Sequence, residues 1–276
     1  NADDGYLSRT FGSAGNQKKW TLSAWVKKTR ADKPIYLLAS DFSDTNNLLY
    51  INLRASNSDA SKNNTGEVLW RNGSGTSYRI TTTQLFRDPS AWYHIVVVCD
   101  TTQASATNRI KFYVNGEQVT SFSNDERSTI GQNDDLAINR AGVHTIASWN
   151  AGEKGGGYIA EYNFIDGQAL TPASFGETNS NTNQWVPIEV TGMTYGTNGF
   201  YLPFSSTELA NSFSNDTYSD AFVPSSNLTV NYLVVAGGGS GGSGDKHNYG
   251  GGGGGAGGLL SGSTSVTSGT SYPITV

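Results

Sequence analysis

Apolar and polar residues alternate in several short stretches along the N-terminal part of the chain. Between Thr21 and Val26, the side chains of Leu22, Ala24 and Val26 share one face of an extended strand, because successive side chains point to opposite sides. This pattern predicts a strand with one face in a core. Similar patterns predict further strands at Ile35 to Ala39, Leu48 to Leu53, Glu67 to Arg71, Ser77 to Thr81 and Gly157 to Ile165.

The run from Tyr93 to Cys99 is almost continuously apolar, which is typical of a strand that is covered on both faces. The clearest turn signal is Asn115-Gly116, a dipeptide that accepts positive φ at both central positions of a type I′ turn. We expect a hairpin there, with arms at Arg109 to Val114 and Gln118 to Phe122. Two more strands are predicted at Leu136 to Asn139 and Phe200 to Phe204.

Helix is expected to be scarce, because Gly, Ser, Thr and Asn are plentiful and suit short strands joined by polar turns. Only Thr171 to Phe175, where Thr precedes Pro, predicts a short helical turn. About ten short strands separated by turns indicate an all-β fold in which two antiparallel sheets form a sandwich.

The composition changes near residue 220. The polar stretch Asn211 to Asn227 predicts a linker, and Val230 to Ala236 predicts a strand. A tract rich in glycine follows, from Gly237 to Gly258, and Leu259 begins a Ser- and Thr-rich tail with renewed strand propensity. We expect this second domain to continue beyond the last residue. The expected division is a sandwich domain at 1–215, a linker at 216–226 and a glycine-rich domain at 227–276.

Charge and composition argue against several functional classes. The formal net charge is -5 and no cluster of Lys and Arg is visible, so no nucleic-acid partner is expected. The single cysteine, Cys99, excludes an intrachain disulfide, and its place at the end of an apolar strand predicts an inert buried thiol. The chain has no stretch of about 18 apolar residues, so we expect no membrane insertion.

No catalytic residue is assigned. Glycosidases need two carboxylates that converge across a cleft, whereas Glu161 and Asp166 stand at an odd separation that would point them to opposite faces of a strand. The three histidines show neither a Ser-His-Asp grouping nor metal-ligand spacing. We expect His94 to be packed or hydrogen-bonded inside a strand, and His144 and His247 to lie in loops. The residues therefore predict a protein that is not an enzyme.

Five stretches in a fixed order carry a resemblance to a known family. They are Tyr6-Leu-Ser-Arg-Thr, Trp20-Thr-Leu-Ser-Ala-Trp-Val-Lys-Lys, Trp92-Tyr-His-Ile-Val, Phe112-Tyr-Val-Asn-Gly-Glu and Ala160-Glu-Tyr-Asn-Phe-Ile-Asp-Gly-Gln-Ala-Leu. The series resembles the laminin-G-like, concanavalin A-like lectin/glucanase superfamily. The last stretch, with Pro172 to Glu177, looks like the form found in bacteriophage virion proteins, notably of marine phages. Tyr232 to Leu260 is similar to a glycine-rich domain that recurs in phage fibre and surface proteins.

The resemblance implies a jelly-roll sandwich that binds sugars. Such binding needs aromatic faces for C–H stacking and planar amides or carboxylates for the hydroxyls. Trp20, Trp25 and Trp92 are expected in the core or over a sheet. The candidate ligand-binding residues, placed in loops, are Trp70, Tyr78, Trp149 and Tyr158, with Arg71, Asn72 and Asn150 beside them.

Calcium is the one cofactor that the resemblance suggests, because members of the superfamily often hold it at a loop edge. The candidate ligands are the acidic pairs Asp41 with Asp44 and Asp134 with Asp135. Neither spacing matches a defined calcium loop. No other cofactor is expected.

The resemblance further implies a fibre or decoration protein on the surface of a phage virion, attached to host cells through a cell-surface glycan. Other virion proteins and further copies of the chain are the expected partners, with a trimer if it forms a fibre. Two alternatives stay open. One is a purely structural capsid or fibre subunit, whose exposed strand edges recruit neighbouring subunits. The other is a polysaccharide-degrading enzyme.

Overall fold

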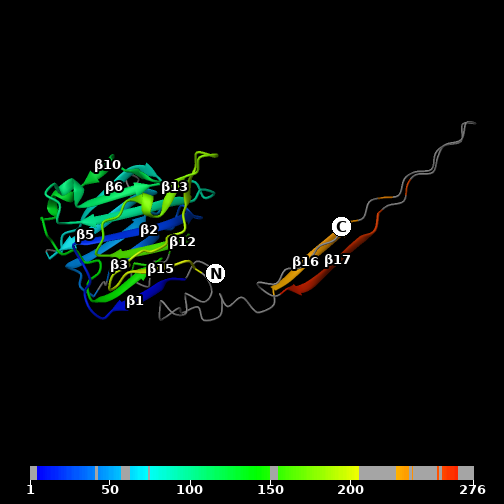
Figure 1. Cartoon of the computed structure of the whole chain (residues 1–276), viewed down its shortest axis with the longest axis horizontal. Helices are drawn as coiled ribbons and strands as arrows, with labels where there is room; N and C mark the ends of the chain where they lie inside the picture. Colours follow the sequence, from blue (N-terminus) through cyan, green and yellow to red (C-terminus); the bar gives the residue numbers. More distant parts are fainter. Residues whose placement is uncertain are drawn as a thin grey trace, which may run out of the picture. The chain divides into compact units, whose positions relative to one another are not determined.

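The computed structural model describes residues 5–40, 43–56, 63–73, 75–149, 155–204, 228–235, 238, 254 and 257–266. The chain divides into two compact units, Asn1–Ser219 and Asp220–Val276. The first unit contains two large antiparallel sheets, and the second contains a two-stranded ribbon (Figure 1). The all-β sandwich expected from the sequence is therefore confirmed. The predicted linker at 216–226 lies outside the described residues.

One sheet of the sandwich has seven strands, in the spatial order β1-β11-β3-β4-β5-β6-β10. All its neighbours pair antiparallel. Its strands are β1 (Leu7–Phe11), β11 (Gly142–Ile146), β3 (Ile35–Ser40), β4 (Asn47–Leu53), β5 (Thr65–Asn72), β6 (Tyr78–Leu85) and β10 (Phe122–Asp125).

The other sheet has six strands, in the order β15-β12-β2-β7-β8-β9. Its strands are β15 (Phe200–Leu202), β12 (Gly157–Asp166), β2 (Lys19–Lys28), β7 (Tyr93–Asp100), β8 (Ile110–Val114) and β9 (Glu117–Gln118). The predicted closing strand is the edge strand β15, which ends just before Pro203. Proline has no backbone N–H for a ladder, so a sheet edge is where it is tolerated.

The core lies between the two sheets. Leu22, Ala24 and Val26 of β2 face it, as the alternation predicted, and they pack with Val97 of β7 and Ile51 of β4. A second apolar cluster lies on the outer face of the six-stranded sheet, where residues from the segment after β12 cover it. That cluster contains Val96, Val98, Ile165 and Phe175, with Leu170, Val190, Met193, Tyr113 and Tyr195 packed against it. β7 is therefore covered on both faces, which explains its continuous apolar sequence.

Helical structure among the described residues is limited to short 3₁₀ turns, and no helix there is long and apolar enough to cross a bilayer. The turns are η2 (Ala106–Asn108), η3 (Arg127–Thr129) and η4 (Pro172–Ser174). The predicted turn at Thr171 to Phe175 is η4, with Pro172 in its first turn. The Thr171 side chain makes no capping hydrogen bond, so the fixed φ of Pro172 is the local cause of this turn.

The Asn-Gly turn joins β8 and β9 as predicted. Asn115 has φ 48° and Gly116 has φ 87°, the positive values that a type I′ turn requires. The second arm is shorter than expected, because β9 ends at Gln118. Phe122 instead begins β10, which pairs with β6 in the other sheet. The chain thus passes from one sheet to the other within the predicted arm.

The predicted strand from Leu136 to Asn139 is wrong, because these residues form no strand. Leu136 and Ile138 are nevertheless buried in the core. The backbone of this loop is satisfied by side chains: Gln17 donates to the Leu136 carbonyl at 2.8 Å, and the Asn139 N–H donates to Nε2 of His144 at 3.1 Å. The apolar pattern therefore indicates burial and not a strand. Side chains from neighbouring segments form the hydrogen bonds that an adjacent strand would otherwise make with this backbone.

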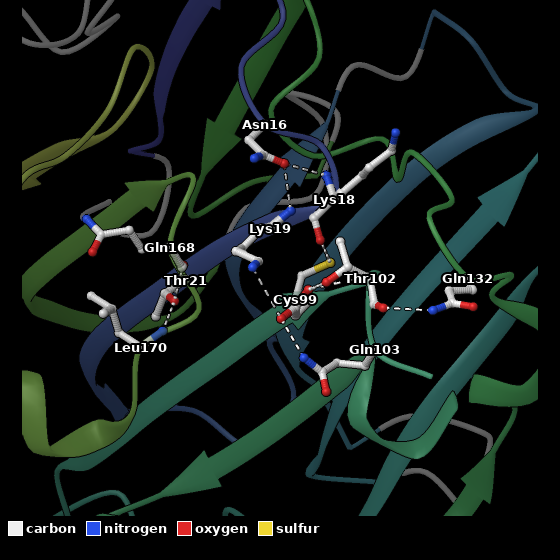
Figure 2. A network of polar contacts seen from close by, with 11 residues as sticks. Asn16, Lys18, Lys19, Thr21, Cys99, Thr102, Gln103, Gln132, Gln168 and Leu170 are labelled. Carbon is white, nitrogen blue, oxygen red and sulfur yellow. Dashed lines mark hydrogen bonds and ion pairs between the residues drawn. The ribbon is translucent and has the colours of Figure 1, made fainter. Parts of the chain in front are cut away.

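Polar contacts fix the ends of β2 and β7 (Figure 2). Oδ1 of Asn16 accepts hydrogen bonds from the backbone N–H groups of Lys18 and Lys19, at 3.1 and 2.9 Å. Nζ of Lys19 lies 3.6 Å from a carboxylate oxygen of Asp100. The Cys99 thiol donates to the Lys18 carbonyl at 3.7 Å, and it is fully buried. The expected burial of Cys99 is confirmed.

The second unit contains two strands, β16 (Leu228–Val235) and β17 (Leu259–Val266). They pair antiparallel, from Leu228 with Val266 to Val235 with Leu259. The strand propensity predicted on both sides of the glycine tract is confirmed.

Candidate functional site

The outer face of the six-stranded sheet carries a row of aromatic rings centred on His94 of β7. The His94 ring lies between Trp25 of β2, at 5.0 Å and 15°, and Trp185, at 6.0 Å and 18°. Trp185 belongs to the short strand β14 (Trp185–Pro187), which pairs with β13 (Gly176–Thr178). Gly116 and Gly176 leave room for its indole, since a Cβ at either would lie 2.7 Å from a Trp185 ring atom.

Both ring nitrogens of His94 are hydrogen-bonded. Nε1 of Trp185 donates to Nδ1 at 2.9 Å, and Nε2 lies 2.9 Å from Oγ of Ser23. Because an indole N–H is only a donor, Nδ1 is the acceptor and Nε2 carries the hydrogen. Burial lowers the pKa of His94 to about 4, so the ring is neutral at physiological pH. His94 is thus packed and hydrogen-bonded as predicted, and neither nitrogen is left for acid–base chemistry.

At one end of this row, two aromatic side chains are exposed. Trp92 is 41% exposed and Tyr158 is 61% exposed, and their ring centroids lie 6.5 Å apart at an angle of 44°. Tyr158 is directly opposite Lys27 in the pairing of β12 with β2. Trp92 directly precedes β7, whose Tyr93 is opposite Val26, so the same register places Trp92 beside Lys27. The two rings therefore flank the strand that carries Lys27.

This arrangement suits a sugar ring. Large aromatic side chains are usually buried, and an exposed pair offers faces on which the C–H groups of a pyranose can stack. The ammonium of Lys27 supplies donors for hydroxyl or acidic groups beside those faces. Tyr158 was a candidate from the sequence, whereas Trp92 was expected in the core or over a sheet.

Trp92 lies over a sheet, which is one of the two places expected for it, but its ring is exposed there. Trp92 and His94 share one face of β7 by alternation, and Ile95 and Val97 face the core on the other side. Trp185 was missed altogether, because it lies in a polar stretch whose short strand has no alternation long enough to read.

Trp149, the sequence candidate in the Gly- and Asn-rich loop, lies over the outer face of the seven-stranded sheet. Its ring packs against Tyr50 at 5.3 Å and Tyr36 at 6.4 Å. Tyr36 and Tyr50 are buried beneath it, edge to face at 5.6 Å. Trp149 thus closes a small apolar cluster, on the sheet opposite to the one that carries Tyr158.

Beside this cluster lies a buried carboxylate. Glu67 is fully buried, with Oε1 2.7 Å from Arg54 and Oε2 3.5 Å from Arg79. Its neighbours on the adjoining strands are Asn52 and Thr81, which are also buried. Oδ1 of Asn52 and Oγ1 of Thr81 have no hydrogen-bond partner. Because two guanidinium groups neutralise Glu67, this row is an internal ion pair rather than a pair of acid and base groups.

The remaining sequence candidates that the structure describes lie apart from both groups of rings. Trp70 is a correction: it lies in β5, fully buried in the core, because it shares the inner face with Val68. Tyr78 packs against the same core. Arg71 donates to Oγ of Ser77 at 2.9 Å and to the Thr45 carbonyl at 2.8 Å. Asn72 donates a hydrogen bond to Asp134 at 2.8 Å. Asn150, the last of the ligand-binding candidates, lies outside the described residues.

The candidate calcium ligands are engaged by the protein itself. Asp44 accepts hydrogen bonds from Asn47 and Arg140, and these lower its pKa to about 2. Asp134 accepts from the Gly131 N–H at 2.6 Å, and Asp135 lies 3.7 Å from Lys18. Asp41 lies outside the described residues. Among the residues that the structure describes, no three His, Cys, Asp or Glu side chains are grouped as a metal site.

Glu161 and Asp166 are held by different partners, and the strand between them is irregular. Glu161 has φ 48° and lies in a bulge between Ala160 and Asn163, so simple alternation does not apply. Its carboxylate accepts a hydrogen bond from the Tyr201 hydroxyl at 2.6 Å. Asp166 instead accepts from Asn139 at 2.6 Å, in a separate buried network. Each carboxylate therefore has its own structural partner.

His144 differs from its expected place in a loop. It lies in β11, it is buried, and its ring stacks on Phe11 at 4.4 Å. His247 lies outside the described residues.

Two family models match the chain. Residues 1–175 match the model described as the concanavalin A-like lectin/glucanases superfamily, and residues 213–276 match that of a glycine-rich domain. A search of curated proteins gave no match.

Solved structures with a similar fold come from several organisms. A heptameric SAP-like pentraxin from Limulus polyphemus is 13% identical with a TM-score of 0.40, covering 74% of this chain and 88% of that chain. Domains LG4-5 of the mouse laminin alpha1 chain are 8% identical with a TM-score of 0.41, covering 86% and 48%. Tailspike protein 2 of an Escherichia coli O157:H7 bacteriophage is 15% identical with a TM-score of 0.40, covering 61% and 22%. These similarities are too distant to carry function.

Proposed function

The chain belongs to the concanavalin A-like lectin/glucanases superfamily, and from that premise we propose that it is a surface protein of a bacteriophage virion, without enzymatic activity, which attaches to a host-cell glycan. The glycan binds to the outer face of the six-stranded sheet. The glycine-rich domain tethers the sandwich to the particle or contacts other virion proteins.

The exposed pair of Trp92 and Tyr158 is the observation that carries the binding role. Its two rings lie 6.5 Å apart on a rigid sheet, so their faces are held in place before a ligand arrives. The stack of Trp25, His94 and Trp185 continues the row and covers the sheet beside the pair. A preformed aromatic surface with a lysine between its rings fits a saccharide better than it fits a reactive centre.

The motif series and the glycine-rich domain support display on a virion. Both resemble segments of phage surface proteins, and the matched regions lie in that order along one chain. A sugar bound at one open surface is held weakly. Display of many copies on one particle compensates through effective concentration, so weak single sites are sufficient for attachment.

The test uses the full 276-residue chain in binding assays on a glycan array and on host cells. The double variant Trp92→Ala/Tyr158→Ala should lose binding, because both stacking faces are removed. Leu85→Ala is the matched control, since Leu85 is exposed to the same 41% but lies in the other sheet. Unchanged binding by the double variant would place the site elsewhere on the protein.

Location on the particle needs a separate experiment. Electron microscopy of intact virions, with an antibody against this chain, should label their outer surface. Absence of the label contradicts the virion role. If another virion subunit covers Trp92 and Tyr158 in the particle, the purely structural role replaces attachment.

A further inference from the structure

We propose that the Trp92–Tyr158 surface selects an acidic sugar, whose anionic group lies against the ammonium groups of Lys27 and Lys33. This inference rests on the proposed glycan-binding function and adds the chemical class of the ligand. It comes from the charges around the two exposed rings.

Lys27 and Lys28 are adjacent in sequence, yet the structure uses them differently. Lys28 is buried and its ammonium donates to the Arg54 carbonyl, to Oδ1 of Asn64 at 2.8 Å and to the Ala31 carbonyl at 3.4 Å. Lys27 points to the opposite face, and its ammonium makes no hydrogen bond or ion pair with a described residue. Its charge is therefore available to a ligand between Trp92 and Tyr158.

Lys33 is a second cation whose stem lies against the segment that leads into Tyr158. A Cβ added to Gly156 would lie 3.1 Å from Cβ of Lys33, so the stem of this lysine packs on the backbone that leads into Tyr158. Arg30 lies beside it, with its Cβ 3.6 Å from the same position. The ammonium of Lys33 makes no hydrogen bond or ion pair within the described part of the chain.

The carboxylates near these lysines already have partners. Asp32 accepts two hydrogen bonds from Arg30, at 3.1 and 2.7 Å. Asp88 accepts from Ser90 at 2.8 and 2.6 Å; these bonds and, to a smaller extent, the charge of Lys27 lower its pKa. The hydrogen bonds from Arg30 and, to a smaller extent, the charge of Lys33 lower the pKa of Asp32. Neither carboxylate forms an ion pair with Lys27 or Lys33, so an external anion can still pair with both ammonium groups.

The positive charge of these two lysines contrasts with the negative net charge of the whole chain. The formal net charge is -5, so a polyanion is repelled by the protein as a whole. Two lysines that have no ion-pair partner among the described residues lie beside the proposed sugar-stacking surface, and they therefore favour an acidic ligand there. A neutral sugar would offer these ammonium groups only hydroxyl acceptors, which are weaker partners than a carboxylate or a sulfate.

The test measures affinity of the full chain for a polyuronic acid, for a sulfated polysaccharide, and for the carboxyl-reduced and desulfated forms of each. We expect tighter binding to at least one acidic polymer than to its neutral form, and the arm that binds identifies carboxylate or sulfate. Lys27→Gln/Lys33→Gln should weaken that binding roughly threefold to tenfold and flatten its salt dependence. Its affinity for the neutral polymers should fall less, because a hydroxyl group is a weaker partner for an ammonium than a carboxylate or a sulfate.

Lys111→Gln is the control, because Lys111 lies on β8, in a different part of the sheet, and also has no ion pair with a described residue. Equal affinity for acidic and neutral polymers, with Trp92→Ala/Tyr158→Ala still abolishing both, overturns this inference and leaves the proposed function standing. Failure to bind any of these polymers overturns this inference, whereas the proposed function fails only if the chain also binds nothing on the glycan array and on host cells. Thermal unfolding of each variant separates lost binding from lost folding.

Discussion

Trp185 donates its indole N–H to Nδ1 of His94 over 2.9 Å, and this bond joins the short β13–β14 ribbon to the central strand β7. The opposite nitrogen of the same ring lies 2.9 Å from Ser23 on β2. One imidazole thus links three parts of the chain that are far apart in sequence. It can do so only while it is neutral, because a proton on Nδ1 would face the indole N–H.

This bond makes stability depend on pH. The pKa of His94 is about 4 in the folded protein and 6.5 in the unfolded chain, because burial disfavours the charged ring. Between these values the unfolded state binds more protons, so the free energy of unfolding should be constant above pH 6.5 and fall as the pH decreases to 4. The loss should be on the order of 3 kcal/mol, measured by urea denaturation at several pH values.

His94→Phe is the control for that slope. The variant should be less stable at neutral pH, because Ser23 and Trp185 lose their partner. Its stability should nevertheless vary less over the same acidic range. An equal slope in both proteins would assign the pH dependence to other groups.

Gly116 has two roles: it adopts the positive φ of the turn, and it leaves space for the Trp185 indole. A pair of substitutions can separate the cost of the backbone conformation from the cost of the contact. Gly116→Ala imposes a side chain at φ 87° and places its Cβ 2.7 Å from the indole. Gly167→Ala imposes the same backbone cost at φ 92°, but its Cβ would have no atom within 4 Å. We expect Gly167→Ala to cost about 1–2 kcal/mol and Gly116→Ala about 1–3 kcal/mol more. Equal losses of stability in thermal or urea unfolding would show that the Trp185 indole does not restrict the side chain at position 116.

Glu67 should be needed for folding rather than for binding. Glu67→Gln removes the charge shared by Arg54 and Arg79, which lie 2.7 and 3.5 Å from its oxygens. The loss should be about 3 kcal/mol, the lower end for a buried pair, because both arginines reach solvent. Glu117→Gln, at an exposed end of β9, should change stability by under about 0.5 kcal/mol. Sugar affinity of the folded Glu67→Gln protein should equal that of the wild type.

The buried thiol gives a further readout of folding. Burial raises the pKa of Cys99, and the neighbouring Asp100 raises it further, so the reactive thiolate is scarce. The native protein should resist a thiol-specific reagent at mildly alkaline pH and react fully in denaturant. With only one cysteine in the chain, the signal has a single source. Rapid labelling of the native protein would place Cys99 at the surface.

Alternation was sufficient to predict the strands that make up most of both sheets. β2 and β4 are long enough for a two-residue period to stand out, whereas β7 was predicted from its continuous apolar run. The Asn115-Gly116 turn defined its hairpin. The strand prediction for Leu136 to Asn139 was wrong because a short buried loop and a short strand can have the same apolar sequence. Distinguishing them needs the partners of its backbone, which are distant side chains.

The candidate site was harder to predict than the fold. The apolar run of β7 does not distinguish its two faces, so the outward direction of Trp92 could not be read from it. The strand patterns also do not say which strands are neighbours. Tyr158 and Trp92 meet only because β12 and β7 flank β2, a sheet order that follows from tertiary pairing. The bulge at Glu161 likewise depends on how β12 pairs, so carboxylate spacing along the sequence could not settle its direction.

The ribbon of the second unit has a consequence for the connection between its two strands. Since Val235 is opposite Leu259, the intervening segment leaves and rejoins the ladder at adjacent positions. The pairing of Val235 with Leu259 holds the two ends of the connection together, and the entropic cost of closing a connection grows only slowly with its length. The register of this ladder is therefore compatible with connections of different length between the two strands.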